Sequence, residues 1–348
     1  MTKFLAAGWS AAYATIALGW TITGRGFPFG PDDPGRDGSP LRNLDPGIGA
    51  PLFAAVLAIT TVVLLVMAGR ELPRGPARTA LLTWMWLVIA ALLLVVPDIR
   101  LLMITGYVPI LIVGFPFGYP PVDYSEILTW VLGNQAFAVA GGLLLCRTVL
   151  RWQFRTAGAC ADCGRPALSG PVRWGPAVTY VAAVIPLLYA VSRVGWALGI
   201  PVGVTPEFLD ELRRTGLVWA GLGLGLFAIA GSILTLGLVQ RWGEVFPRWM
   251  VGLAGRRVPI RLATIPATLV AVFVGSASVA LAADPESWRT ILTPDGLASA
   301  PWVTWPAWSV ALGAATLAYY LRRRPACEMC GVGDPPAGVV PVTQAGAY

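Results

Sequence analysis

Apolar residues gather along this chain into long runs separated by short polar segments. A helix crosses roughly 30 Å of hydrocarbon with about 20 residues, because each residue advances it by about 1.5 Å. Backbone groups in lipid need internal partners, so such runs are predicted to be helices rather than open strands. Eight runs approach this length: Phe4–Gly24, Ala50–Ala68, Thr79–Val96, Glu126–Cys146, Gly175–Gly199, Gly216–Gln240, Leu262–Ala283 and Thr304–Leu321. The pattern predicts an all-α, polytopic helical membrane protein with eight transmembrane helices.

Two apolar runs need separate interpretation. Leu101–Gly114 has only about 14 residues, too few to span untilted, and Pro109 and two glycines weaken it as a helix. We predict an outer-face or re-entrant segment buried against protein. The first run follows Lys3 as a signal peptide would, but its length and the lack of a cleavage site after it favour a retained anchor.

Composition supports the membrane class. Hydrophobic residues make up 56% of the 348 positions and charged residues 12%, which is far from the balance of a soluble domain. The net charge of +7 does not indicate a nucleic-acid partner, because the basic residues are spread over short loops between apolar runs. The predicted partners are the lipid bilayer and a protein in the membrane or the cytoplasm.

The loop charges give an independent test of the eight-span topology. Loops predicted to share the side of the amino terminus carry a net +12 and the opposite loops −5, which together recover the +7 of the chain. Cytoplasmic loops carry an excess of Lys and Arg. We therefore expect a cell-membrane protein with both termini in the cytoplasm.

Short repeats indicate an internal duplication. The segment Ala68-Gly-Arg-Glu-Leu-Pro73 recurs as Ala254-Gly-Arg-Arg-Val-Pro259, each after the second helix of a half. Each half then has four helices and an even number of crossings, so the repeats are parallel. The predicted units are residues 1–168 and 169–334, followed by a flexible tail at 335–348.

Two cysteine knuckles carry the most specific chemistry. Cys160-Ala-Asp-Cys163-Gly164 and Cys327-Glu-Met-Cys330-Gly331 stand 167 positions apart, each after an apolar run that ends in arginines. In a C-x-x-C-G turn two thiolates face one ion while the glycine takes a positive φ. Four thiolates suit a structural zinc shared by the halves, in a chain without histidine. Arginines beside the pairs would partly offset the −2 charge of such a centre: Arg155, Arg165 and Arg322 to Arg324.

Other interpretations of these cysteines stay open. One C-x-x-C is enough for a redox dithiol, two separate disulfides would form only outside a reducing compartment, and the thiols could be unliganded. Cys146 lies inside an apolar run, where it is most simply a small apolar residue.

Catalytic patterns are missing. Without histidine there is no His-based acid–base chemistry, and no P-loop or GxGxxG follows a strand pattern. We expect no enzymatic activity. Acidic residues collect near the outer helix ends, where solvated helix caps are the plain interpretation and a cation or substrate mouth the alternative: Asp98, Asp123, Glu126, Asp284 and Glu286.

Few polar residues fall inside the predicted spans. Asn134 and Gln135 lie deepest, where they either bond a facing helix or orient a ligand in an intramembrane site. Arg193 is the nearest ionisable residue to mid-span, and we expect it to snorkel to the outer surface.

Several short segments and the residue usage of the chain resemble those of a known group of membrane proteins. The segments GYVPILIVGFPFGYPPVDY and LGNQAFAVAGGLLLC and the tail ACADCGR are similar to uncharacterised multipass membrane proteins that are common in actinobacteria. High Ala, Gly, Arg and Pro usage fits such a source. The resemblance implies a duplicated helical fold and brings no assigned activity. The second half has no counterpart to Asn134-Gln135, so a symmetric central site is not expected.

Three functional hypotheses follow. The chain has predicted metal ligands but no predicted catalytic residues, which favours a scaffold or accessory subunit with a cytoplasmic structural zinc. The second hypothesis is a small-molecule or ion transporter with a path between the repeats, which predicts a cavity lined by Asn134, Gln135, Tyr13 or Thr60. The third is a membrane thiol oxidoreductase, which predicts that the two cysteine pairs lie apart.

Overall fold

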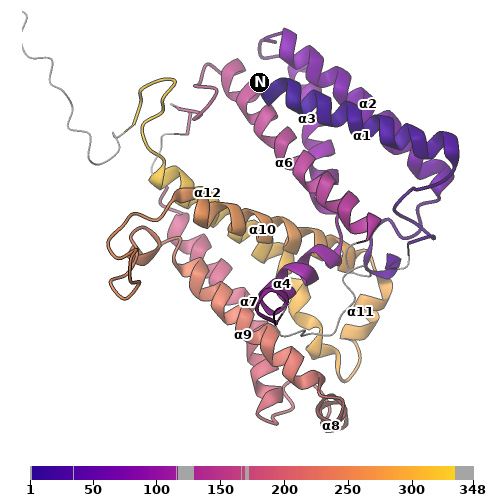
Figure 1. The fold of residues 1–348 in the computed structure, drawn as a ribbon, viewed down its shortest axis with the longest axis vertical. Helices are drawn as coiled ribbons and strands as arrows, with labels where there is room; N and C mark the ends of the chain where they lie inside the picture. Colours follow the sequence, from indigo (N-terminus) through magenta and orange to yellow (C-terminus); the bar gives the residue numbers. More distant parts are fainter. Residues whose placement is uncertain are drawn as a thin grey trace, which may run out of the picture.

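The computed structural model describes residues 2–33, 35–114, 116, 129–165, 167–168 and 172–333, and every regular element in these ranges is a helix (Figure 1). Beyond the helices, the described chain has only an isolated antiparallel bridge between Val245 and Arg257. The all-α class is confirmed. The predicted tail 335–348 lies outside the described residues.

The longer helices, in chain order, are α1 (Thr2–Thr23), α2 (Pro46–Gly69), α3 (Pro76–Ala90), α4 (Ile99–Gly114), α6 (Trp130–Thr156), α7 (Gly175–Ala197), α9 (Leu217–Leu236), α10 (Ile260–Ala282) and α12 (Trp305–Arg323). A π-helical turn, Ala91–Val95, continues α3. The short helices α8 (Pro206–Arg214) and α11 (Pro285–Ile291) lie in loops, and 3₁₀ turns cover Arg36–Gly38, Arg241–Gly243, Gly296–Ala298 and Ala300–Thr304.

Five helices of the described chain are long and apolar enough to cross a membrane: α2, α3 with its π turn (Pro76–Val95), α7, α9 and α10. These helices agree with the membrane class expected from composition. The remaining predicted spans correspond to α1, α6 and α12, helices of 22, 27 and 19 residues that are not among the five. Arginines lie in the last turns of α6 and α12, and α6 also contains Asn134 and Gln135. The count of eight remains a prediction.

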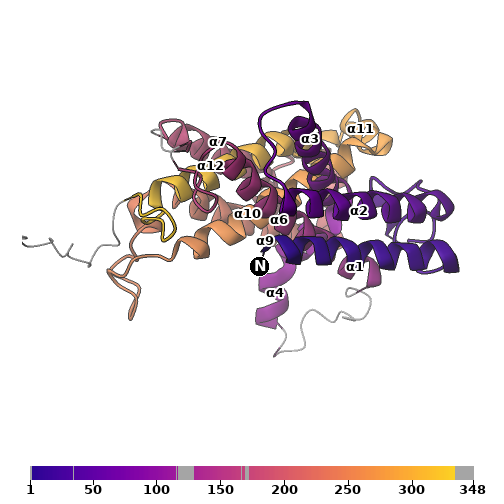
Figure 2. The ribbon, with the colours of Figure 1, turned by 90° about the horizontal axis from the view of Figure 1, so that it is seen from above.

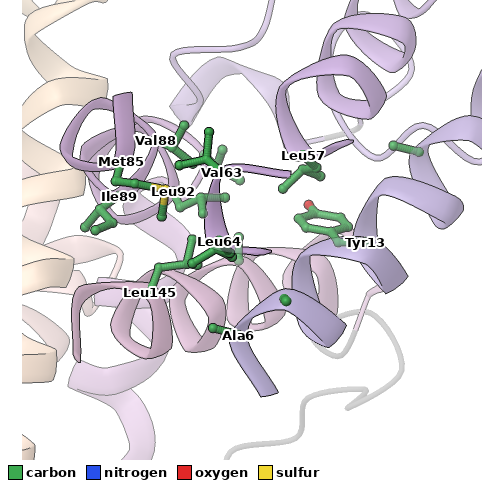
Figure 3. Close-up of a cluster of buried hydrophobic side chains, with 14 of the residues drawn as sticks. Ala6, Tyr13, Leu57, Val63, Leu64, Met85, Val88, Ile89, Leu92 and Leu145 are labelled. Atoms are coloured by element: carbon green, nitrogen blue, oxygen red, sulfur yellow. The ribbon is translucent and has the colours of Figure 1, made fainter. Parts of the chain in front are cut away.

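Each half of the chain has its own hydrophobic core. The first core joins α1, α2, α3 and α6 through residues that include Tyr13, Leu57, Met85 and Leu145 (Figure 3). The second joins α7, α10 and α12, and a smaller one links the end of α7 to α8 and the start of α9. The pairs α1–α2, α7–α9 and α10–α12 lie side by side (Figures 1 and 2).

Helix α4 joins the two halves. Residues 99–114 form one continuous helix although Pro109 and two glycines weaken the propensity for it, and the outer-face or re-entrant placement remains a prediction. It packs against α10, and at Gly106 it approaches α9 so closely that an added Cβ would lie 3.5 Å from Leu224. Packing against neighbouring helices overrides the weak propensity of such residues. Its 16 residues extend about 24 Å, still short of a full crossing.

The repeated hexapeptide takes different local structures. Ala68 and Gly69 end α2, whereas Ala254 and Gly255 lie in a long loop before α10, where Gly255 has φ +75°. Both copies precede the third long helix of their half.

Candidate metal centre

Each cysteine knuckle is a tight turn held by equivalent backbone hydrogen bonds. The Gly164 and Gly331 N–H groups donate to Cys160 O and Cys327 O, both at 2.8 Å. Cys160 N–H donates to Arg165 O at 2.8 Å, and Cys327 N–H to Val332 O at 3.2 Å. The glycines have φ +70° and +67°, which confirms the predicted left-handed turn.

The two knuckles face each other. Cys160 Sγ lies 3.8 Å from Cys327 Sγ and Cys163 Sγ lies 3.6 Å from Cys330 Sγ. All four sulfurs fall within 4.8 Å of one another. A tetrahedron of thiolates about 2.3 Å from a zinc ion has sulfur–sulfur edges of about 3.8 Å. The four sulfurs are therefore close enough together to hold a single metal ion.

Two arginines connect the tails around the cluster. The buried Arg324 donates from Nη1 to Cys163 O at 2.5 Å and from Nη2 to Leu168 O. In return, Arg165 donates from Nη1 to Val332 O and to Pro325 O, the latter at 3.2 Å. Each tail thus supplies a guanidinium that binds carbonyls of the other tail. Desolvation, and then the charge of Arg165, lower the pKa of Arg324.

The other arginines predicted to surround the cluster are engaged elsewhere. Arg155 pairs with Glu71 at 3.5 Å, and Arg322 pairs with Glu244 at 2.9 Å. Arg323 donates to carbonyls of the loop before α10. Of these five arginines, Arg165 and Arg324 are the ones that bind carbonyl groups of the two knuckle tails within the described residues. Closeness to the cysteines in the sequence did not distinguish these two arginines from the other three.

The thiols of the first knuckle titrate differently. Hydrogen bonds from the N–H groups of Cys163 and Asp162 lower the pKa of Cys160 to about 7. Desolvation, together with the neighbouring thiols, raises the pKa of Cys163 to about 12. One sulfur of the cluster is therefore readily available as a thiolate, the form that binds metals.

The five cysteines form no disulfide in the structure. The contacts run between the two C-x-x-C pairs, so the separation expected of two independent redox dithiols is not observed. Cys146 packs against the first core, as an apolar residue would.

Asn134 and Gln135 of α6 are buried, and each forms a hydrogen bond to another segment of the chain. The Tyr13 hydroxyl of α1 donates to Asn134 Oδ1 at 2.5 Å, and Gln135 Nε2 donates to Asp98 Oδ2 at 2.6 Å. Gln135 Oε1 is buried without a partner among the described residues. The contacts agree with the interpretation of these amides as interhelical bonds.

Asp98 accepts a hydrogen bond from the Arg100 N–H at 2.9 Å at the start of α4, as a helix cap would, but it is not solvated as we predicted. Its residue is 0% exposed and its carboxylate binds the Arg100 guanidinium at 2.5 Å. The same guanidinium binds Asp33 at 2.6 Å. The predicted exposure of Asp98 to solvent was wrong because Arg100 and Gln135 supply the hydrogen-bond partners that water would otherwise provide. In the sequence, the Asp-x-Arg spacing directly after an apolar run was the signal that could have indicated this ion pair.

The other acidic residues behave as helix-end groups. Asp284 caps α11 and pairs with Arg42 at 2.6 Å. Partial burial alone would raise the pKa of Asp284, but hydrogen bonds from Arg42 and Ser287 outweigh it and leave the pKa below its ordinary value. Glu286 is exposed and pairs with Arg289. Asp123 and Glu126 lie outside the described residues.

Arg193, which we predicted to snorkel to the outer surface, is partly buried and lies beside residues of the loops around α11. Its guanidinium stacks on the rings of Tyr189 and Trp196, 4.4 and 4.1 Å from their centroids, and donates to Ala298 O. It lines a cavity of about 310 Å³ that also includes Asp284 and Trp302. A second, open cavity of about 550 Å³ lies along α3 beside Arg78 and Trp86. Neither of these cavities is lined by Asn134, Gln135, Tyr13 or Thr60.

No protein-family model, curated protein or solved structure matches this chain. Its class therefore follows from its own features, which are apolar helices able to cross a membrane and four cysteines placed to bind a metal ion.

Proposed function

We propose that this chain is a non-enzymatic integral membrane scaffold or accessory subunit, in which a structural zinc bound by Cys160, Cys163, Cys327 and Cys330 joins two four-helix halves. The observation that carries this proposal is the approach of four sulfurs, from tails that follow α6 and α12, to within 4.8 Å. A zinc ion there would supply a cross-link without redox chemistry.

The proposed topology has eight crossings and two parallel repeats. The separate cores of the halves support it, and so does the shared pairing of first with second helix, α1 with α2 and α7 with α9. The proximity of the knuckles favours an even number of crossings between them, and the four long helices α7, α9, α10 and α12 lie between them in the chain. The excess of arginine in the loops beside both knuckles favours the cytoplasm for this side.

Packing around the intramembrane amides favours a scaffold over a transporter. Tyr13, Thr60 and Gln135 are 0% exposed, and Asn134 is bonded to Tyr13. Leu, Val and Met side chains fill the first core between the same helices. A transport path would instead require polar groups that line a cavity.

Metal analysis of the detergent-purified full chain tests the zinc proposal. We expect one zinc per chain in the wild type and loss of that zinc in both Cys163→Ser and Cys330→Ser, which remove one ligand from each knuckle. Cys146→Ser is the matched control, because Cys146 packs against the first core away from the cluster. Unchanged zinc in both knuckle variants would reject the shared site.

Thiol labelling in intact cells tests the topology separately. A membrane-impermeant maleimide should react with neither knuckle until the membrane is opened. Reaction of one knuckle from outside would reject the even number of crossings, whatever the metal content.

A further inference from the structure

An apolar tip projects from the loop between α9 and α10. Trp249 is 78% and Val251 97% exposed, and Leu253 is also exposed. The loop extends beyond the ends of both helices (Figure 1). Exposed apolar side chains gathered in one loop indicate an interaction surface.

Exposed arginines lie within this loop and at its two ends: Arg241, Arg248, Arg256, Arg257 and Arg261. Among the described residues, none of the five forms an ion pair with a carboxylate, and the only acidic residue of the loop, Glu244, is paired with Arg322. The surface therefore combines unpaired positive charge with aromatic and aliphatic side chains, which are the groups that bind anionic membrane surfaces.

The base of the loop is firmly held. Phe246 N–H donates to Arg256 O and Gly255 N–H to Phe246 O, both at 3.0 Å. From α12, Arg323 donates to Val258 O at 3.0 Å, and the Tyr319 hydroxyl donates to Gly243 O at 2.7 Å. These hydrogen bonds hold the loop at the ends of α9 and α10, two helices that are long and apolar enough to span a membrane.

We propose that residues 245–257 bind anionic phospholipid headgroups in the leaflet at this end of the helices. Trp249, Val251 and Leu253 enter the interface, and the arginines bind the lipid phosphates. A leaflet is favoured over an acidic protein because the loop begins and ends on helices that reach the membrane surface. This inference needs the membrane class but not the zinc.

Hydrogen exchange of the full chain in nanodiscs tests the proposal. Amides of residues 246–257 should exchange more slowly with phosphatidylglycerol present than in phosphatidylcholine alone. Each arginine near an anionic surface contributes about fivefold to binding. The triple variant Arg248→Gln, Arg256→Gln, Arg257→Gln should therefore lose the difference, and Trp249→Ser should reduce it. High salt should weaken it in the wild type.

Matched controls separate headgroup binding from misfolding. The triple variant Arg213→Gln, Arg214→Gln, Arg289→Gln removes the same charge from other loops and should keep the lipid effect. Inorganic phosphate added to phosphatidylcholine discs should not protect the loop. Equal exchange in the two lipid compositions would overturn the proposal, as would full protection in the first triple variant. Protection only by an added acidic protein would overturn it in favour of a docking surface.

Discussion

At the residue scale, burial distinguishes groups that the linear pattern treats alike. Asp98 and Asp284 both follow apolar runs, yet Asp98 is fully buried in a network with Arg100, Asp33 and Gln135, while Asp284 caps a surface helix. A buried carboxylate is stable only with charged or hydrogen-bonding partners, so its role depends on what surrounds it.

Asp98→Asn should destabilise the chain. Removing one partner of a buried ion pair costs about 3–5 kcal/mol, and we expect about 2 kcal/mol here because Arg100 keeps Asp33. Unfolding in detergent by denaturant measures the loss. Glu286→Gln, which breaks an exposed pair with Arg289, is the control and should change stability by less than about 1 kcal/mol. Equal effects of the two would contradict the structural role of Asp98.

Gly331→Ala should weaken metal binding. Gly331 has φ +67° and no atom within 4 Å of an added Cβ, so the substitution tests backbone conformation alone. A left-handed conformation costs a non-glycine residue about 1–2 kcal/mol, or roughly tenfold in zinc affinity. Competition with a chelator measures this affinity. Gly313→Ala, within α12 and equally open, should leave it unchanged.

At the element scale, helix ends depend on single capping residues. Asp284 accepts hydrogen bonds from the N–H groups of Glu286 and Ser287 at the start of α11, and its ion pair with Arg42 ties this helix to the loop before α2. The cap is local in sequence, but Arg42 lies 242 positions away. The local sequence can therefore predict the cap but not the ion pair with Arg42.

The contribution of Asp284 should depend on pH. Its pKa is lowered in the folded chain, so its stabilisation is complete above the ordinary value of about 3.8 and is lost as the pH falls through the folded value. Asp284→Asn keeps much of the cap but not the charge. The wild type should unfold at a higher temperature than this variant near neutral pH, and the difference should shrink in acid. A difference that grows in acid would contradict the assignment.

At the scale of the whole molecule, three hydrophobic clusters and one cysteine cluster hold the described chain together. Helix α4 packs between the halves, while the knuckles meet at the ends of α6 and α12. A metal bound there would add a cross-link to tails that hydrogen bonds from Arg165 and Arg324 already connect. Its effect should therefore be local to the tails.

Chelation should release the tails and leave the helices. We expect residues 157–168 and 324–333 to become sensitive to protease once metal is removed, with far-ultraviolet circular dichroism unchanged. Added zinc should restore protection in the wild type but not in Cys330→Ser. Unchanged protease resistance after verified metal loss would contradict a structural role for the ion.

The sequence by itself determined the helical membrane class and the local form of each knuckle. Both follow from short-range physics, because an apolar run in lipid must bond its own backbone and a C-x-x-C-G turn needs the freedom of glycine. Tertiary packing decided that Asp98 is buried, that α4 is helical, and that Arg165 and Arg324 rather than their neighbours connect the tails. These outcomes depend on contacts between residues that are far apart in the chain, and the order of apolar and polar positions does not encode such contacts directly.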